Sequence, residues 1–192
     1  MKKLIFLFIS LLVSNFLLYS QDKIAMVIAS QHFRDEEFFI PKNEFEHAGF
    51  KVLVFSSRKG TCTGMLGGQF QVNHTLEDLN IDDFVAIIFV GGVGAQEYWN
   101  NPLAHNICKE AYNKNKIVGA ICIAPVILAN AGILKSKKAT SWPSEKEKLK
   151  QQGAIFTGKG VEQDRNIITA VGPRFAKEFA LKIIKSIKEK KQ

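Results

Sequence analysis

A cysteine stands where a buried strand meets a helix, a geometry that can activate a nucleophile. Residues 117–125 read Ile-Val-Gly-Ala-Ile-Cys-Ile-Ala-Pro, so an apolar strand ends at Cys122 and a helix follows. The free N–H groups and positive dipole end of that helix favour a thiolate over a thiol. The pattern predicts a nucleophile elbow with cysteine in place of serine. The alternative is a small apolar cysteine buried in the core.

Two further loops can bring reactive groups to this cysteine. Gly91 and Gly92 end the most apolar run, residues 84–90, which is typical of a strand buried on both faces of a parallel sheet. The N–H groups of Gly92 and Ile123 are candidate donors to a developing oxyanion. Three acids, at positions 35–37, follow the apolar run at residues 23–29, which is the first predicted strand. One of these carboxylates can therefore lie at the same edge of the sheet.

The chain alternates between short apolar runs and segments with helical spacing. The predicted strands cover residues 23–29, 51–55, 84–90, 117–121, 138–141 and 154–156, with two more between 160 and 170. The predicted helices cover residues 36–48, 102–115, 125–131, 144–152 and 173–188, and the Gly/Thr-rich residues 60–72 are predicted to form an irregular hairpin. This alternation predicts a mostly parallel sheet covered on both faces, with ligands bound at the carboxyl ends of the strands.

The first twenty residues have the layout of a secretory signal peptide. Two lysines precede an apolar core, and Ser20 lies just before a polar segment. The core is short for a membrane span, which needs about 20 apolar residues. An uncleaved anchor helix is the alternative, and membrane contact is expected through this segment only. We therefore expect an exported protein, periplasmic or extracellular, with one domain over residues 21–192.

Composition excludes several classes of protein. The chain has 192 residues, of which 46% are hydrophobic and 23% charged, with a formal net charge of +8. These values argue against disorder, collagen and coiled coil. No His/Cys spacing suits a metal, and no cofactor is expected. The lysines at 182–191 alternate with apolar residues and lack aromatic neighbours, which indicates a solvated helix face and no nucleic-acid partner.

Several motifs, in order, give the chain a resemblance to a known superfamily. They are Phe33-Arg34-Asp35-Glu36-Glu37 with Ile40-Pro41, Gly91-Gly92, Ala120-Ile121-Cys122 with Pro125, Ala131-Gly132, Thr140-Ser141-Trp142-Pro143, and Ile167-Ile168-Thr169 with Gly172-Pro173. Over residues 23–187 the chain resembles the ThiJ/PfpI superfamily, which includes the PfpI-type intracellular proteases and the Parkinson-associated deglycase. The resemblance implies a flavodoxin-like, three-layer α/β sandwich of the class I glutamine amidotransferase type, and a homodimer.

The resemblance also implies roles for individual residues. Cys122 matches the reactive cysteine, and Glu37 matches the carboxylate hydrogen-bonded to it. A buried carboxyl beside a thiolate has a raised pKa, so a neutral Glu37 would donate a hydrogen bond to the sulfur. Asp35 and Glu36 are expected to be solvated acids at a helix N-terminus, where the dipole favours them.

Two histidines of the superfamily are missing. The PfpI-type proteases have histidine directly after the nucleophile, where this chain has Ile123, and the deglycase branch has histidine before a proline, where this chain has Trp142. A cysteine amide hydrolase needs an imidazole, so a peptidase or amidase is disfavoured. Trp142 is expected to form an apolar pocket wall. His32 and His74 lie in loops and are the candidates to approach Cys122.

The remaining histidines and cysteines are expected to be structural. His47 and His105 fall on predicted helices. Cys108 is predicted to lie in the core, and Cys62 on an exposed turn. Export would permit a disulfide, but three cysteines leave at least one thiol free or paired outside the chain.

Three functions are compatible with these patterns. The first is glyoxalase- or deglycase-like chemistry, in which Cys122 adds to an α-oxoaldehyde. The second is a non-enzymatic redox sensor or stress-protective protein, whose partner is an oxidant. The third is a cysteine peptidase or amidase. The first two make a small electrophile or oxidant the expected partner.

Overall fold

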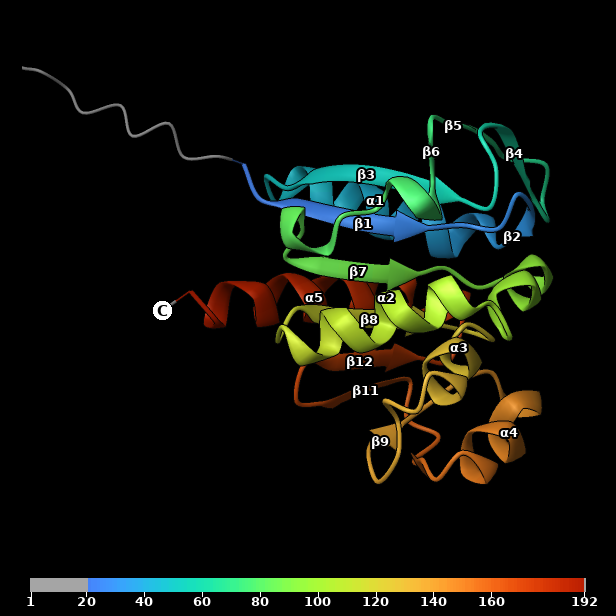
Figure 1. The fold of residues 1–192 in the computed structure, drawn as a ribbon, viewed down its shortest axis with the longest axis vertical. Helices are drawn as coiled ribbons and strands as arrows, with labels where there is room; N and C mark the ends of the chain where they lie inside the picture. Colours follow the sequence, from blue (N-terminus) through green and yellow to red (C-terminus); the bar gives the residue numbers. More distant parts are fainter. Residues whose placement is uncertain (1–20, 192) are drawn as a thin grey trace, which may run out of the picture.

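A computed structural model describes residues 21–191, so the predicted signal peptide lies outside the described residues. A seven-stranded sheet in the order β11-β12-β8-β7-β1-β3-β6 forms the centre of the molecule (Figure 1). Its strands are β1 (Lys23–Val27), β3 (Lys51–Ser56), β6 (His74–Thr75), β7 (Ala86–Phe89), β8 (Ile117–Ile121), β11 (Val161–Asp164) and β12 (Ile167–Ala170). β11 pairs antiparallel with β12, and the other pairings are parallel.

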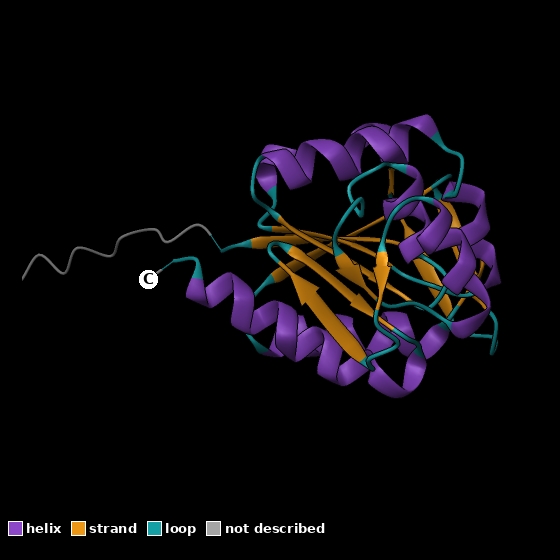
Figure 2. Cartoon of the chain, turned by 90° about the horizontal axis from the view of Figure 1, so that it is seen from below, coloured by secondary structure: helices purple, strands orange, loops and turns teal. Residues whose placement is uncertain are grey.

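Helices cover both faces of this sheet, as Figure 2 shows. α1 (Asp35–His47) and α5 (Ala176–Glu189) pack against each other on one face. α2 (Pro102–Asn113) and α3 (Pro125–Asn130) cover the other face, with α4 (Lys146–Gln151) beside α3. Short 3-10 turns lie at Leu76–Asp78, Ile81–Asp83, Val93–Tyr98, Pro143–Glu145 and Pro173–Phe175. The predicted flavodoxin-like three-layer arrangement is confirmed.

Strand periodicity explains why the sheet has two apolar faces. In β7, the most central strand, Ile87 and Phe89 belong to the core under α2 and α3, whereas Ala86 and Ile88 belong to the core under α1 and α5. All four are fully buried. In α5, Phe179, Ile183 and Ile187 face the sheet at helical spacing while the lysines face solvent.

Two smaller sheets accompany the central one, the first near the carboxyl ends of its strands and the second beside its edge strand β11. β2 (Gln31–Phe33), β4 (Gly60–Gly64) and β5 (Gln69–Val72) form one, and β9 (Lys138–Ala139) and β10 (Ile155–Phe156) form the other. The hairpin predicted over residues 60–72 is confirmed as the antiparallel pair β4–β5. β2 and β6 were not predicted, because they are short and no apolar run marks them. β9 and β10 are as short as β6, but both lie within predicted strands, at 138–141 and 154–156.

The prediction for Cys62 is wrong, and that for Cys108 is right. Cys62 lies in the middle of β4 and is fully buried in the core around Phe33 and Phe38. Strand alternation turns its side chain inward while its neighbours face outward. Cys108 is fully buried on α2, as expected. All three cysteines are free thiols.

The last helix also differs in detail from the prediction. Pro173 begins a 3-10 turn, and the α-helix starts three residues later at Ala176. Among the residues that the structure describes, no helix is both long and apolar enough to cross a membrane.

Candidate active site around Cys122

Cys122 occupies a sharp turn between β8 and α3. Its φ is 64°, in the left-handed region that residues other than glycine rarely adopt. Two hydrogen bonds hold this conformation: the Cys122 N–H donates to the carbonyl of Ala170 (2.9 Å), and its own carbonyl accepts from the N–H of Trp142 (2.7 Å). A strained residue of this kind costs about 1–3 kcal/mol and is common at functional sites. The turn leaves Cys122 partly exposed, whereas the other two cysteines are buried.

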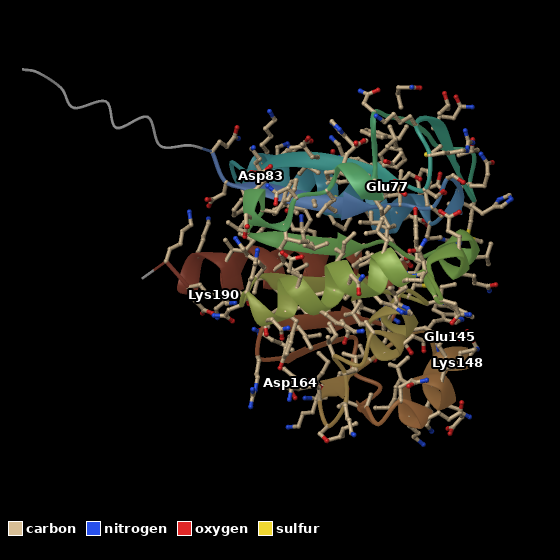
Figure 3. All side chains as sticks on the ribbon, in the orientation of Figure 1. Glu77, Asp83, Glu145, Lys148, Asp164 and Lys190 are labelled. Atoms are coloured by element: carbon tan, nitrogen blue, oxygen red, sulfur yellow. The ribbon has the colours of Figure 1, made fainter. Side chains whose placement is uncertain are left out.

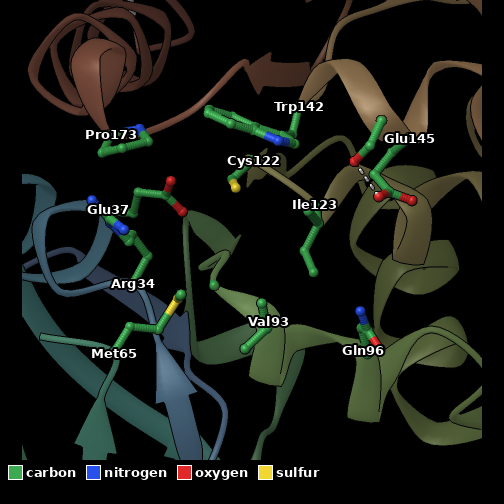
Figure 4. Close-up of a pocket in the computed structure, with 12 residues that line it drawn as sticks. Arg34, Glu37, Met65, Val93, Gln96, Cys122, Ile123, Trp142, Glu145 and Pro173 are labelled. Carbon is green, nitrogen blue, oxygen red and sulfur yellow. Dashed lines mark hydrogen bonds between the residues drawn. The ribbon is translucent and has the colours of Figure 1, made fainter.

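Glu37 lies beside this cysteine, from the first turn of α1 (Figure 4). Its side chain is fully buried, and within the described part of the chain neither carboxyl oxygen makes a hydrogen bond of good geometry, so the expected hydrogen bond to the Cys122 sulfur is not formed. The Cys122 thiol and the Gly91 N–H still lie near enough to lower the pKa of the carboxyl. Gly91 makes the approach possible, because a Cβ there would lie 2.3 Å from Glu37 Oε2 and 2.6 Å from the Cys122 Cβ. A buried carboxyl without a partner is rare and calls for a functional explanation.

Burial sets the charge state of this pair. It raises the pKa of Glu37 to about 8, against the weaker opposing effects of contact with Cys122 and of the Arg34 guanidinium. The carboxyl therefore keeps its proton near neutral pH. Burial, and then the negative charge of ionised Glu37, raise the pKa of Cys122 to about 12. The second contribution vanishes when Glu37 is protonated, so a neutral carboxyl favours the thiolate.

Two backbone amides act on the sulfur in the opposite direction. The N–H groups of Gly92 and Ile123 lower the pKa of Cys122. Gly92 has a φ of 93°, and a Cβ on it would lie 2.3 Å from the backbone nitrogen of Arg34. The two amides that the sequence pattern singled out therefore lie at the sulfur. An anion formed there would meet these two N–H donors.

Arg34 and Asp35 arrange the rim of the site. Arg34 makes a two-point ion pair with Glu36, with Nε–Oε2 and Nη2–Oε1 distances of 2.8 and 3.1 Å. The expectation that Asp35 is solvated is wrong: it is buried and accepts hydrogen bonds from the N–H groups of Leu66 (2.8 Å) and Gly68 (2.7 Å). Asp35 thereby fixes the β4–β5 turn, which carries Met65 into the pocket.

The cysteine opens into a pocket of about 370 Å³. Of the predicted site residues, the structure places Cys122, Glu37, Gly92, Ile123 and Trp142 in its lining. The sequence analysis missed the other lining residues, which are Arg34, Met65, Val93, Gln96, Ser144, Glu145 and Pro173. Ser144 and Glu145 directly follow the Trp142-Pro143 step, so their position in the chain was a usable signal.

The two histidines predicted near the pocket are not there. His32 lies in β2 with an exposed side chain, and only its backbone carbonyl packs against the Gly91-Gly92 loop. His74 lies on the edge strand β6, with its ring 5.5 Å from that of Phe55. His47 is exposed at the end of α1, and His105 contacts the carbonyl of Trp99 at 2.8 Å. None of the four histidines lines the pocket.

The described residues form no metal-binding cluster beside the cysteine. Within residues 21–191, no group of three or more His, Cys, Asp or Glu side chains is placed to hold a metal ion. The reactive groups of the site are therefore a thiol, a protonatable carboxyl and backbone amides. Together they can add sulfur to an electrophilic carbon, stabilise an oxyanion and move one proton.

An α/β sandwich with a cysteine on its nucleophile elbow and a buried carboxyl beside it defines the class of this protein. The model of the DJ-1/PfpI family matches residues 22–186, and the chain belongs to this family.

Relatives and solved structures agree with that assignment. The uncharacterized protein MJ0967 of Methanocaldococcus jannaschii is 52% identical over 170 residues, covering 87% of this chain and 83% of the relative. Deglycase PYRAB04690 of Pyrococcus abyssi is 30% identical over 148 residues, covering 77% and 89%. The ThiJ/PfpI domain protein of Brachyspira murdochii superposes with a TM-score of 0.86 at 32% identity, covering 88% of this chain and 98% of the other.

Proposed function

We propose that this protein converts α-oxoaldehydes, free or as adducts on amines, by glyoxalase- or deglycase-like chemistry at Cys122. The observation that carries the proposal is the fully buried Glu37, whose oxygens have no hydrogen-bond partner in the described chain although they lie against the cysteine. Such a carboxyl is free to exchange its proton with a bound substrate. A relative from Pyrococcus abyssi that carries the name deglycase supports the same chemistry.

The reaction begins when Cys122 loses its thiol proton to water and the sulfur adds to the aldehyde carbon. A carbon–sulfur bond forms and the carbonyl π bond breaks, which places the negative charge on oxygen. The N–H groups of Gly92 and Ile123, which face the sulfur, are placed to stabilise that oxygen. Neutral Glu37 then donates its proton to the oxygen and becomes a carboxylate.

Glu37 next moves a proton between the two substrate carbons. The carboxylate removes the hydrogen from the former aldehyde carbon and returns a proton to the neighbouring carbon. The proton on the first oxygen moves to the neighbouring oxygen, so that a carbonyl re-forms next to sulfur and a hydroxyl forms on the adjacent carbon. Water cleaves the resulting thioester, which releases an α-hydroxy acid and the thiol. One carbon is oxidised while its neighbour is reduced, so no external oxidant is consumed.

A redox role is the second candidate, and the burial of the other thiols favours it. Cys62 and Cys108 are fully buried whereas Cys122 is partly exposed, so oxidants meet Cys122 first. A sulfinate at Cys122 could accept hydrogen bonds from the two amides and from neutral Glu37. A peptidase or amidase role is not favoured, because no histidine lines the pocket.

The cellular setting is part of the proposal. The signal-peptide pattern at residues 1–20 supports export to the periplasm or beyond. Membership of the superfamily supports a homodimer. Gel filtration and separation of cell fractions test these two points.

Turnover of methylglyoxal tests the proposed chemistry. The purified protein is incubated with methylglyoxal and lactate is measured, with Cys122→Ala as the matched control. Lactate formation that depends on Cys122 is expected. If wild type and Cys122→Ala form lactate at the same rate, the enzymatic proposal is wrong. Mild peroxide treatment followed by mass spectrometry tests the redox role, which requires oxygen to appear at Cys122 before Cys62 or Cys108.

A further inference from the structure

The pocket has a polar end that the proposed chemistry does not use. Gln96 and Glu145 line it beyond Ile123, on the far side from Glu37 (Figure 4), and Ser144, which donates a hydrogen bond to Glu145, lines it with them. We infer that this end binds the hydroxyl groups of a substrate tail, so that the preferred substrate is a polyhydroxylated α-oxoaldehyde derived from a sugar. The inference rests on the proposed function and names its substrate class.

Glu145 is a fixed hydrogen-bond acceptor at this end. It is buried, and its two oxygens accept hydrogen bonds from Ser144 Oγ (2.7 Å) and Lys148 Nζ (2.6 Å). Lys148 lies beside Glu145 at the α4 end of the molecule (Figure 3), with its ammonium 5.0 Å from the centre of the Trp99 ring. Each carboxylate oxygen can accept a second hydrogen bond. The geometry therefore leaves acceptor capacity for a ligand hydroxyl.

Gln96 supplies both kinds of hydrogen-bonding group. It lies on the turn Val93–Tyr98, and its exposed side-chain amide makes no hydrogen bond with the described residues. An amide offers two N–H donors and a carbonyl acceptor. A hydroxyl both donates and accepts, so Gln96 and Glu145 together match a group that does both.

The charges around the pocket favour a neutral tail. Glu145 is compensated by Lys148, so a cationic tail would gain little. Arg34, at the other end, is engaged by Glu36, so an anionic tail would also gain little. Between the ends, Ile123 and Trp142 provide an apolar wall against which the C–H groups of a sugar chain can pack.

The pocket is large for a three-carbon substrate. Its volume of about 370 Å³ falls within the range of sites that enclose most of the surface of a drug-sized ligand. Methylglyoxal would occupy the reactive end and leave the polar end filled with water. A longer substrate would displace that water and satisfy the polar groups, and sites built on such groups reject analogues that lack the hydroxyls.

A comparison of two substrates tests the inference. Methylglyoxal and glucosone, the α-oxoaldehyde of glucose, are given separately to wild type, Gln96→Leu and Glu145→Gln, and the kcat/KM for α-hydroxy acid formation is measured. We expect wild type to prefer glucosone, and the ratio of glucosone to methylglyoxal kcat/KM to fall by roughly tenfold in each variant. Gln151→Leu and Glu147→Gln, both at exposed positions of α4, are the matched controls and should keep the ratio.

The outcomes separate this inference from the proposed function. Equal kcat/KM for the two substrates in wild type, or an unchanged ratio in Gln96→Leu, overturns the polar-end inference while Cys122-dependent turnover of methylglyoxal still stands. Turnover of neither substrate overturns both. Gln96 is exposed, so Gln96→Leu should fold like wild type. Glu145 is buried, so a thermal melting curve checks that Glu145→Gln is folded.

Discussion

The backbone N–H of Trp142 donates a hydrogen bond to the carbonyl oxygen of Cys122, with an N–O distance of 2.7 Å. This bond ties Trp142, which the family resemblance aligns with the histidine of the deglycase branch, directly to the turn at Cys122. The indole, 45% exposed, forms one wall of the pocket and packs against the backbone at Gly172. The site therefore has an apolar surface at the position where the deglycase branch carries a base.

Replacing this wall by an imidazole should change thiol reactivity. Trp142→His places a proton acceptor beside Cys122, and we expect its alkylation by iodoacetamide near neutral pH to accelerate by roughly tenfold, because an adjacent base favours the thiolate. Trp142→Phe is the control, since it opens similar space without a base. Equal rates for the two variants would show that position 142 does not reach the sulfur.

The variant Glu37→Gln should lose the proposed proton transfer while Cys122 keeps its reactivity as a nucleophile. We expect a loss of turnover on the order of 10²–10⁴, the usual contribution of general acid–base catalysis. Alkylation of Cys122 should persist, and above the wild-type Glu37 pKa of about 8 it should be faster than in wild type, because the repelling carboxylate is gone. Glu46→Gln, exposed on the same helix, serves as the control. Wild-type turnover by Glu37→Gln would show that Glu37 does not carry the proton in the reaction.

The raised pKa of Glu37 also predicts how stability depends on pH. The carboxyl titrates at about 8 in the folded protein and near 4.5 when unfolded. Between these values the folded state holds a proton that the unfolded state has lost, so the stabilisation present at low pH disappears as pH rises through the folded pKa. The free energy of unfolding should fall by roughly 1.4 kcal/mol per pH unit in this window.

Denaturant unfolding at several pH values measures this slope. Glu37→Gln should remove most of it, because glutamine does not titrate. The difference in stability between variant and wild type should therefore grow in favour of the variant as pH rises. Parallel pH profiles for the two proteins would contradict the raised pKa.

Asp35→Asn should loosen the turn that carries Met65. An asparagine keeps one acceptor oxygen but presents an NH2 group to a backbone N–H, so one of the two hydrogen bonds to Leu66 and Gly68 is lost at a cost of about 1–3 kcal/mol. Amide hydrogen exchange at these two residues should accelerate, and KM should rise more than kcat falls. Asp83→Asn, at an exposed position, is the control. Unchanged exchange at Leu66 and Gly68 would show that Asp35 does not hold the turn.

The sequence predicts the parts of this structure that depend on local periodicity. The bounds of β8 match the prediction, and Cys122 at its end does form a tight turn with positive φ. The approach of Glu37 was implied by family resemblance and not by spacing. The partners of Asp35 lie 31 and 33 residues away, so the local rule for acids at a helix N-terminus gave the wrong environment.

The remaining features of the fold and the site could not be predicted, because they depend on packing between loops that are distant in the sequence. Cys62 follows strand alternation, but the glycines and threonines around it read as a surface turn. His74 belongs to a two-residue edge strand whose place in the sheet is set by pairing with β3. Gln96 and Glu145 come from different turns and line the same pocket only because the fold brings these two turns to one end of it.

The first and last described segments meet at the edge of the molecule opposite the pocket. An ion pair joins Asp22, just before β1, to Lys191, just after α5, at the amino ends of the central strands. A tag, a surface tether or a linking peptide attached at these two residues would therefore lie on the side of the described domain away from the pocket. Immobilised through either residue, the protein would present its opening outward to the surrounding fluid.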